Sequence, residues 1–334
     1  MSASILVAPD KFKGTFGADE VAAALAEGIR AAGGEARELP VADGGEGTMR
    51  ALASALGGEI RTTFCHDPLG REVTAHFALL ADGETAVVDV AAASGLALLR
   101  DDELDPWAAS SAGTGQLIRT AAKAGAGTVV VGAGGSATVD GGAGAIDVIV
   151  GGASVPRLVV ACDVATPWER AAEVFGPQKG ADPAMVTRLA ARLDELAEAA
   201  PRDPRGILMT GAAGGLAGGL WAHLGAELVP GADYVLDAIG FDEALAGAES
   251  VVTGEGRLDA QTLEGKAVAA VAARAGAAGI PCDAVTGQNH LTDTEQAALG
   301  LRTILEATNR NELVTAGTKL TRTPTTPTRG SDPP

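Results

Sequence analysis

Residues 5–34 read ILVAPDKFKGTFGADEVAAALAEGIRAAGG, and this stretch decides the fold. The apolar run Ile5–Ala8 is typical of a buried strand. After a loop, apolar residues recur at every fourth position, as on the buried face of a helix: Val21, Leu25 and Ile29. Two glycines at 33–34 then end the helix. The stretch therefore predicts a strand, a loop and a helix in succession.

The same order repeats on both sides of a long central region. Residues 35–41 read as a second strand, and Thr48 is placed to cap a helix that Gly57-Gly58 ends. The helix presents one apolar stripe: Met49, Leu52 and Leu56. After an apolar run at 250–253, a helix from Lys266 and strands at 283–285 and 303–305 resume the pattern. Alternating strands and helices favour a parallel, Rossmann-like sheet.

The central region follows a different period. Between residues 58 and 90 apolar residues alternate, which predicts an antiparallel meander: Val73, Ala75, Phe77 and Leu79. Apolar runs at 128–131 and 158–161 predict buried strands. Asp182-Pro183 is a strong helix start, and a buried stripe follows it: Met185, Leu189, Leu193 and Leu196.

These patterns predict two unlike α/β domains, a Rossmann-like parallel-sheet domain with a second, mixed-sheet domain inserted into it. The expected boundaries are residues 1–60 and 245–316 for the discontinuous first domain and 61–244 for the insert. Residues 317–334 are rich in Thr and Pro with few large apolar groups, so we expect a disordered tail.

Composition excludes several classes of function. The 334 residues suit about two domains, and the net charge of −18 argues against nucleic acid or an acidic membrane surface as partner. No apolar run reaches the ~18 residues of a membrane span, and the first residues lack a basic leader, so we expect a cytoplasmic location. Three scattered cysteines indicate neither disulfides nor a zinc site.

Glycine-rich loops carry the chemistry that the sequence suggests. Such loops bring backbone N–H groups close to phosphate. The chain has only six lysines, and four lie in or beside these loops: Lys11, Lys13, Lys179 and Lys266. Surface lysine is the plain interpretation of any one of them, but the set indicates phosphate binding by mobile point charges.

Acidic residues cluster beside the same loops: Asp10, Asp43, Glu46, Asp140, Asp163, Glu255 and Asp259. A single Asp beside Gly is more often a turn former. Phosphoryl transfer, however, needs cations for phosphate, carboxylates for Mg²⁺ and one proton acceptor, and all three kinds are present.

The chain does not match two common nucleotide-binding motifs, the dinucleotide-binding fingerprint and the Walker loop. Gly132-x-Gly134-x-x-Ala137 follows a strand but precedes residues that make a poor helix, so a dinucleotide site is disfavoured. Gly265-Lys266 is followed by Ala267, and the first glycine of a Walker loop is replaced by Ala260.

Six blocks in order resemble the bacterial glycerate kinase family: APDKFKG at 8–14, PVADGGEGT at 40–48, GGSAT at 134–138, DGG at 140–142, FGPQKGA at 175–181 and TGEGRLD at 253–259. The resemblance covers about residues 5–305. It implies ATP-dependent phosphorylation of D-glycerate to 2-phosphoglycerate, with Mg²⁺, in a cleft between two α/β domains. We expect a monomer or homodimer.

The resemblance and the loop chemistry together give an expected site. Lys13 and Lys179 would neutralise phosphate and carboxylate charge as catalytic residues together with Asp43 and Asp163, and Mg²⁺ ligands would come from Asp43, Asp163 and Asp140. Arg257 is expected to bind the glycerate carboxylate. The remaining expected substrate and phosphate contacts are Lys11, Gly44, Gly45, Gly134, Gly135, Ser136, Thr138, Gln178 and Glu255.

The chain departs from the family pattern at four places. The connection 144–158 is short, residues 165–168 read ATPW where Asn-Pro-Leu is expected, Val139 replaces an Asn, and the Thr/Pro-rich end is atypical. Two alternatives therefore stay open: a kinase of another small 2-hydroxy acid, or an impaired paralogue that binds nucleotide or organic acid without turnover.

Overall fold

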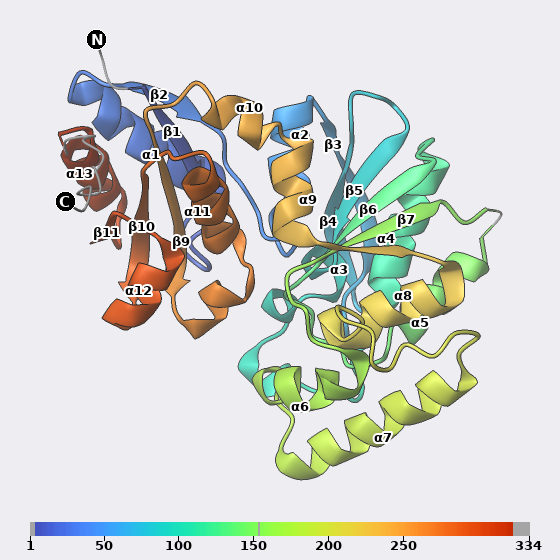
Figure 1. Cartoon of the computed structure of the whole chain (residues 1–334). Helices are drawn as coiled ribbons and strands as arrows, with labels where there is room; N and C mark the ends of the chain where they lie inside the picture. The colour runs from blue at the N-terminus through green and yellow to red at the C-terminus, as the bar shows by residue number, and fades with distance from the viewer. Residues whose placement is uncertain (1–3, 153, 323–334) are drawn as a thin grey trace. The chain divides into compact units, whose positions relative to one another are not determined.

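The computed structural model describes residues 4–152 and 154–322, except the side chains of residues 261 and 264. The chain forms two compact units (Figure 1). Unit 1 lies within residues 1–40, 240–263 and 267–334, and unit 2 comprises 41–239 with 264–266. The fold class expected from the sequence is confirmed, with one parallel and one mixed sheet.

Unit 1 contains a five-stranded parallel sheet in the order β11-β10-β9-β1-β2. Its strands are β1 (Ser4–Pro9), β2 (Glu35–Glu38), β9 (Ser250–Leu258), β10 (Cys282–Asn289) and β11 (Thr303–Glu306). Its helices are α1 (Ala18–Ala31), α10 (Phe241–Leu245), the 3₁₀ helix η6 (Ala260–Glu264), α11 (Ala267–Ala277), α12 (Asp293–Leu299) and α13 (Arg310–Thr321).

Helices cover both faces of the unit 1 sheet. Val285 packs in a cluster with residues of α1 and α13, whereas its neighbour Ala284 packs in another with Val268 of α11. Successive strand residues point to opposite faces, so α1 and α13 lie on one face and α11 on the other. This is the two-sided cover that a parallel sheet requires.

The end of the chain differs from expectation. Helix α13 continues to Thr321 and therefore includes residues that the sequence assigned to a tail beginning at 317. The reason is Gly317, where a Cβ would lie only 2.2 Å from the Leu25 carbonyl oxygen of α1. The missing side chain allows the two helices to approach closely, a long-range contact that local composition does not report. Residues 323–334 of the expected tail lie outside the described residues.

Unit 2 contains a six-stranded mixed sheet in the order β3-β4-β5-β6-β7-β8. Its strands are β3 (Glu59–His66), β4 (Glu72–Leu79), β5 (Thr85–Asp89), β6 (Thr128–Ala133), β7 (Arg157–Cys162) and β8 (Glu227–Pro230). The first three form the predicted antiparallel meander, and β5 to β8 pair in parallel. Both central apolar runs are strands, as predicted.

The helices of unit 2 are α2 (Thr48–Leu56), α3 (Ala91–Ser94), α4 (Ala112–Lys123), α5 (Ala143–Val150), α6 (Ala171–Phe175), α7 (Pro183–Ala199), α8 (Leu216–Leu224) and α9 (Gly231–Ala238). Short 3₁₀ turns are η1 (Leu96–Leu98), η2 (Asp101–Glu103), η3 (Trp168–Arg170), η4 (Pro177–Lys179) and η5 (Ala212–Gly215). The Asp182 cap of α7 is confirmed, since its carboxylate accepts from Met185 N–H at 2.7 Å. No helix in the described ranges is long and apolar enough to cross a membrane.

Helix α2 belongs to unit 2, although the sequence-based boundary placed residues 41–60 with the first domain. The reason is Asp89 at the end of β5, whose carboxylate accepts from Gly47 N–H at 2.8 Å and Met49 N–H at 3.0 Å. The helix cap is Gly47, with a left-handed φ of 97°, so the predicted Thr48 cap is wrong. A carboxylate distant in sequence satisfies the orphan amides instead.

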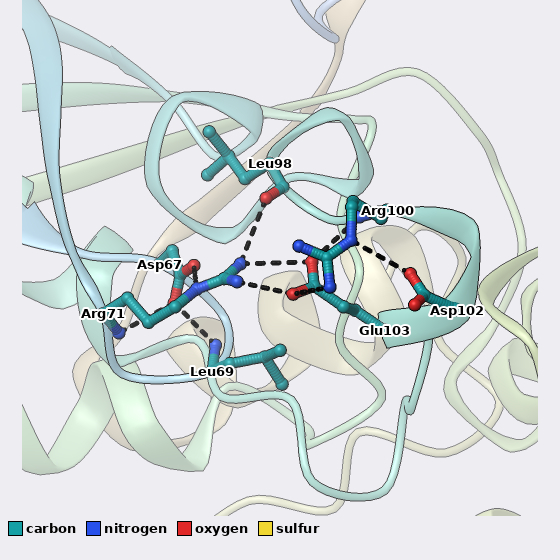
Figure 2. Close-up of polar contacts among 7 residues, drawn as sticks. All are labelled: Asp67, Leu69, Arg71, Leu98, Arg100, Asp102 and Glu103. Carbon is teal, nitrogen blue, oxygen red and sulfur yellow. Dashed lines mark hydrogen bonds and ion pairs between the residues drawn. The ribbon is translucent and has the colours of Figure 1, made fainter.

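A polar network fixes the turn between β3 and β4 (Figure 2). Asp67 accepts from Leu69 N–H and Arg71 N–H, both at 2.9 Å, and from Arg71 Nε at 2.6 Å. Arg71 also donates to Glu103 Oε1 at 2.7 Å. Burial raises the pKa of Asp67, but hydrogen bonds from Arg71 and Leu69 outweigh it and hold that pKa below its usual value. The hairpin is therefore tied to η2.

Candidate active site

The parallel strands of unit 2 end at one edge of its sheet, where a site is expected in α/β folds. Asp89 ends β5, Gly134 directly follows β6 and Asp163 directly follows β7. The loop that begins at Asp43 reaches the same edge, because a Cβ on Gly132 would lie 3.0 Å from the Gly45 carbonyl oxygen. Segments far apart in sequence thus meet here.

Asp43 and Asp163 form a carboxylate pair around two glycines. A Cβ on Gly134 would lie 2.6 Å from the Gly45 Cα and 2.7 Å from Asp163 Oδ2. A Cβ on Gly45 would lie 3.0 Å from Asp43 Oδ1 and 3.4 Å from Asp163 Oδ2. Both side chains therefore present an oxygen to one small region that any larger residue would fill.

The Asp43 loop depends on close backbone contacts. Asp43 Oδ1 accepts from Gly45 N–H at 3.0 Å. Gly44 has a left-handed φ of 92°, and a Cβ there would lie 2.6 Å from the Gly231 Cα at the start of α9. Together with the Asp89 cap of α2, these contacts hold the carboxylate of Asp43, which is only 9% exposed.

A buried lysine lies beside this region. Lys179 is 2% exposed, and its ammonium group donates to Ser136 Oγ at 2.8 Å and to the Thr138 carbonyl oxygen at 2.7 Å. These three residues form the Lys179 cradle. The lysine reaches inward because Gly180, with a left-handed φ of 93°, ends the η4 turn directly after it.

Burial lowers the pKa of Lys179 to about 7, while the negative charges of Asp140 and Asp163 raise it in part. An ammonium group taken out of water loses solvation that two neutral acceptors replace only in part. The cradle is therefore a place where an additional negative charge would be strongly favoured.

The cradle also contains an unsatisfied hydroxyl. Within the residues that the structure describes, the buried side-chain atoms without a hydrogen-bond partner are Thr138 Oγ1 and Thr48 Oγ1. Thr138 is 0% exposed, and its own carbonyl oxygen accepts from Lys179. A buried donor without a partner costs about 1–3 kcal/mol. A cation and an unused hydroxyl thus belong to the same small segment.

Asp140 has a different surrounding from the carboxylate pair. Its Oδ2 accepts from Ser111 N–H at 2.9 Å, Ser111 Oγ at 2.7 Å and Gly144 N–H at 3.3 Å. Its Oδ1 accepts from Gly142 N–H at 3.1 Å. Asp140 therefore joins the starts of α4 and α5, with both oxygens engaged by protein donors.

The departures at Val139 and Trp168 come together in the fold. Both are buried and pack in one apolar cluster with Leu189 and Leu193 of α7. The Trp168 indole N–H donates to the Leu193 carbonyl oxygen at 2.9 Å. An apolar residue at 139 therefore suits its surroundings, beneath the loop that carries Asp140.

Other predicted residues lie in unit 1. Lys11 N–H donates to Asp10 Oδ1 at 2.6 Å, and its Nζ lies 3.9 Å from the same oxygen. Lys13 is exposed. Gly256 permits this loop to approach β9, because a Cβ there would lie 3.0 Å from the Lys13 nitrogen.

Gln178, which belongs to unit 2, is exposed although its neighbour Lys179 is buried.

The end of β9 contains two more predicted residues of unit 1. Glu255 accepts from Thr262 Oγ1 at 2.6 Å. Arg257 is exposed and donates through Nε to Gln288 Oε1 at 3.2 Å. Unit 1 therefore gathers Lys11, Lys13, Glu255 and Arg257 near the carboxyl ends of β1 and β9, and unit 2 gathers the carboxylate pair and the Lys179 cradle.

Sequence reasoning missed Asp89. The sequence signal is an Asp at the end of an apolar strand, Val87-Val88-Asp89. In the structure Asp89 is buried, with 6% of its surface exposed. Within the described residues no group of three or more His, Cys, Asp or Glu side chains is arranged to hold a metal ion. Two carboxylates nevertheless fit Mg²⁺, which usually takes one or two of them together with water and substrate phosphates.

Known proteins resemble this chain along most of its length. The family model "Glycerate kinase family" matches residues 5–153 and 151–324. The glycerate kinase of Bacillus subtilis is 39% identical over 325 residues, covering 85% of this chain and 84% of that protein. The glycerate 2-kinase of Escherichia coli is 38% identical over 307 residues, covering 80% and 81%.

A solved structure agrees with these relatives. A crystal structure from Salmonella typhimurium LT2, provisionally assigned as a glycerate kinase 2, superimposes with a TM-score of 0.78. The two chains are 34% identical, and the match covers 96% of each. The resemblance inferred from the six sequence blocks is thereby confirmed.

Proposed function

The chain belongs to the glycerate kinase family, and on this premise we propose that it transfers the γ-phosphoryl group of Mg-ATP to the 2-hydroxyl of D-glycerate. The hydroxyl oxygen bonds to the γ-phosphorus, the bond from that phosphorus to the bridging oxygen breaks, and ADP and 2-phosphoglycerate form. The hydroxyl proton passes to a carboxylate of the enzyme. The name of the Escherichia coli relative supports the choice of hydroxyl.

The observation that carries the proposal is the buried Lys179 cradle. Its ammonium group and the unpartnered Thr138 hydroxyl offer donors to an anion. We expect the amides of Gly134 and Gly135 to add to them. Preorganised donors in a site that excludes water stabilise developing charge far better than exposed ones. We assign the transferring phosphoryl group, or the glycerate carboxylate, to this cradle.

The carboxylate pair has the second role. Asp43 and Asp163 would hold Mg²⁺ or accept the hydroxyl proton, and the geometry leaves the division between them open. A bound Mg²⁺ would neutralise phosphate charge as it develops. Because the oxygens of Asp140 are engaged by Ser111, Gly142 and Gly144, we assign Asp140 to holding the loops in place.

The residues of unit 1 complete the proposal. Lys11, Lys13 and Arg257 supply positive charge, and Glu255 a carboxylate, for the nucleotide or the glycerate carboxylate. Use of ATP, the interdomain cleft and a cytoplasmic location stay predictions from the sequence. The chemistry requires that the reacting hydroxyl and the γ-phosphorus be held in line and away from water.

The test is identification of the product. The full chain is incubated with Mg-ATP and D-glycerate, and ³¹P and ¹H NMR distinguish 2- from 3-phosphoglycerate. Tartronate and lactate serve as competing acceptors. We expect 2-phosphoglycerate and a preference for D-glycerate. Another preferred acceptor would replace the substrate assignment, and thermal stabilisation by Mg-ATP and glycerate without any product would contradict the kinase.

A further inference from the structure

Strand β3 is an unprotected edge of the unit 2 sheet. It is eight residues long, contains no proline, and among the described residues it pairs with β4 alone. The opposite edge strand, β8, has four residues and ends at Pro230. Natural proteins usually shorten or interrupt exposed edges, because an open edge pairs with another chain. The two edges of this sheet are thus built differently.

One face of β3 is apolar and exposed. Ile60 is 44% exposed and Phe64 is 68% exposed, whereas Cys65 on the other face is buried in the core with residues of α4. Even-numbered side chains therefore share the exposed face. His66 N–H donates to Gln116 Oε1 of α4 at 2.8 Å rather than to β4, so the amides of the even-numbered residues point toward the open edge.

Unpaired positive charge lies beside this edge. A cavity of about 300 Å³ is lined by the end of β3 and by Arg119 and Lys123 of α4. Like charges four residues apart on a helix repel each other. In the described part of the chain neither side chain forms an ion pair, although acidic residues outnumber basic ones by 43 to 25. Glu72 of β4 also lines this cavity, so two cations there face one carboxylate of the same chain, and a second carboxylate from outside would balance the charge.

We infer that β3 pairs with β3 of a second copy of this chain, antiparallel about a two-fold axis at Thr62, to form one continuous sheet. Opposed residues in such a pair share a face, so only residues of equal parity meet. A two-fold axis at Arg61 would place Arg61 directly opposite Arg61 of the second copy, and the two like charges would repel each other. A centre at Thr62 sets Ile60 against Phe64 of the second copy twice, which joins the exposed apolar residues.

The same register accounts for the cations. It sets Glu59 of the second copy opposite Cys65, on the face that α4 covers. In the single chain Glu59 pairs with Arg61 at 2.9 Å, an exposed ion pair that contributes little. In the dimer Glu59 would instead reach the cavity that Arg119 and Lys123 line. A second copy in this one register therefore covers the exposed apolar residues of β3 and also brings a carboxylate to the two cations. Of the two oligomeric states expected from the sequence, monomer and homodimer, this inference selects the homodimer.

The first test measures mass in solution. Sedimentation equilibrium of the full chain at micromolar concentration is expected to give twice its 33.1 kDa mass. Phe64→Lys is expected to raise the dimer dissociation constant at least about tenfold. The control Leu208→Lys alters another exposed apolar residue, 62% exposed, and should leave the dimer intact. A monomeric wild-type chain, or an unchanged dimer in Phe64→Lys, would overturn the inference.

The second test fixes the register without weakening the fold. Thr62→Cys brings two thiols together across the two-fold axis, with Cα atoms about 5.5 Å apart, close enough for a disulfide. The control is Thr74→Cys, an exposed residue on β4. The native cysteines are buried, and burial raises the pKa of Cys65 to about 11, so they remain unreactive. Mild oxidation should crosslink Thr62→Cys alone; a crosslink in both variants, or in neither, would rule out this register.

Discussion

The carboxyl ends of the two sheets use the same loop chemistry in opposite ways. In unit 2, Asp43 and Lys179 are buried. Asp43 accepts from Gly45 N–H, and Lys179 donates to Ser136 and Thr138. In unit 1, Lys13 and Arg257 are exposed. A buried, hydrogen-bonded charge is fixed before the ligand arrives, whereas an exposed side chain must be ordered by it. Under the proposed function, we expect unit 2 to hold the reacting centre and unit 1 to contribute adjustable binding groups.

The buried half carries a thermodynamic penalty that the exposed half lacks. Among the described residues, the ammonium group of Lys179 donates hydrogen bonds only to Ser136 Oγ and the Thr138 carbonyl oxygen, and Thr138 Oγ1 has no partner. Partly satisfied polar clusters destabilise a fold. A protein tolerates such a cluster where a ligand completes it.

The largest expected effect is the loss of turnover when a residue of the carboxylate pair is substituted. Asp163→Asn keeps the shape of the side chain but removes its charge, so kcat should fall about 10²–10⁴-fold, the range for loss of a proton acceptor. Arg257→Ala in unit 1 is the matched exposed change and should mainly raise the KM for glycerate. Steady-state kinetics with Mg-ATP measures both. Equal effects on kcat would break the distinction between the two regions.

The next effect is steric. Gly134→Ala places a methyl group 2.7 Å from Asp163 Oδ2 and 2.6 Å from the Gly45 Cα, so the loops must separate. We expect a loss of about 1–3 kcal/mol in the free energy of unfolding, as for overpacked cores. Gly127→Ala is the control, because a methyl group there meets no atom within 4 Å. Urea unfolding compares them, and equal stability would contradict the tight packing of the site.

The last expected effect concerns the pH dependence of stability. The pKa of Lys179 is about 7 in the folded chain and near 10.5 when the chain is unfolded. Between these values the unfolded state binds more protons, so the stability of the wild-type chain rises with pH. Lys179→Met removes this dependence and should be more stable than wild type below pH 7 by about 1–4 kcal/mol.

The advantage of Lys179→Met should shrink as the pH rises from 7 toward 10. Lys13→Met is the control, because an exposed ammonium group has no burial penalty to relieve. Thermal unfolding across the pH range measures the difference. A constant difference between wild type and Lys179→Met at all pH values would show that the lysine is not held in a low-dielectric site.

Much of the fold follows from local sequence. Apolar periods and glycine stops give the strands and helices of both sheets, and Asp182-Pro183 marks the start of α7 because a cap is a local interaction. The boundary at 40 and the Gly47 cap depend on Asp89, which lies 40 residues after Met49 of α2. The length of α13 depends on Gly317 against α1. Local patterns do not report such contacts.

The candidate site was predictable in composition but not in division of labour. The sequence brought together Asp43, Asp163 and Lys179 through their glycine loops, and the structure places these three in unit 2. It did not distinguish Asp140, whose neighbours Ser111 and Gly144 engage its carboxylate. Burial and hydrogen-bond partners separate residues that look alike as Asp or Lys beside Gly.

The most direct test of the central claim compares two lysines in one assay. The rate of glycerate phosphorylation at saturating Mg-ATP is measured for Lys179→Met and Lys13→Met, with circular dichroism to confirm that both fold. Loss of the buried ammonium should lower kcat about 10²–10³-fold, as for other preorganised donors, and loss of the exposed one should act mainly on KM. Near-normal turnover in Lys179→Met, with collapse in Lys13→Met, would contradict the claim that the buried cradle holds the reacting group.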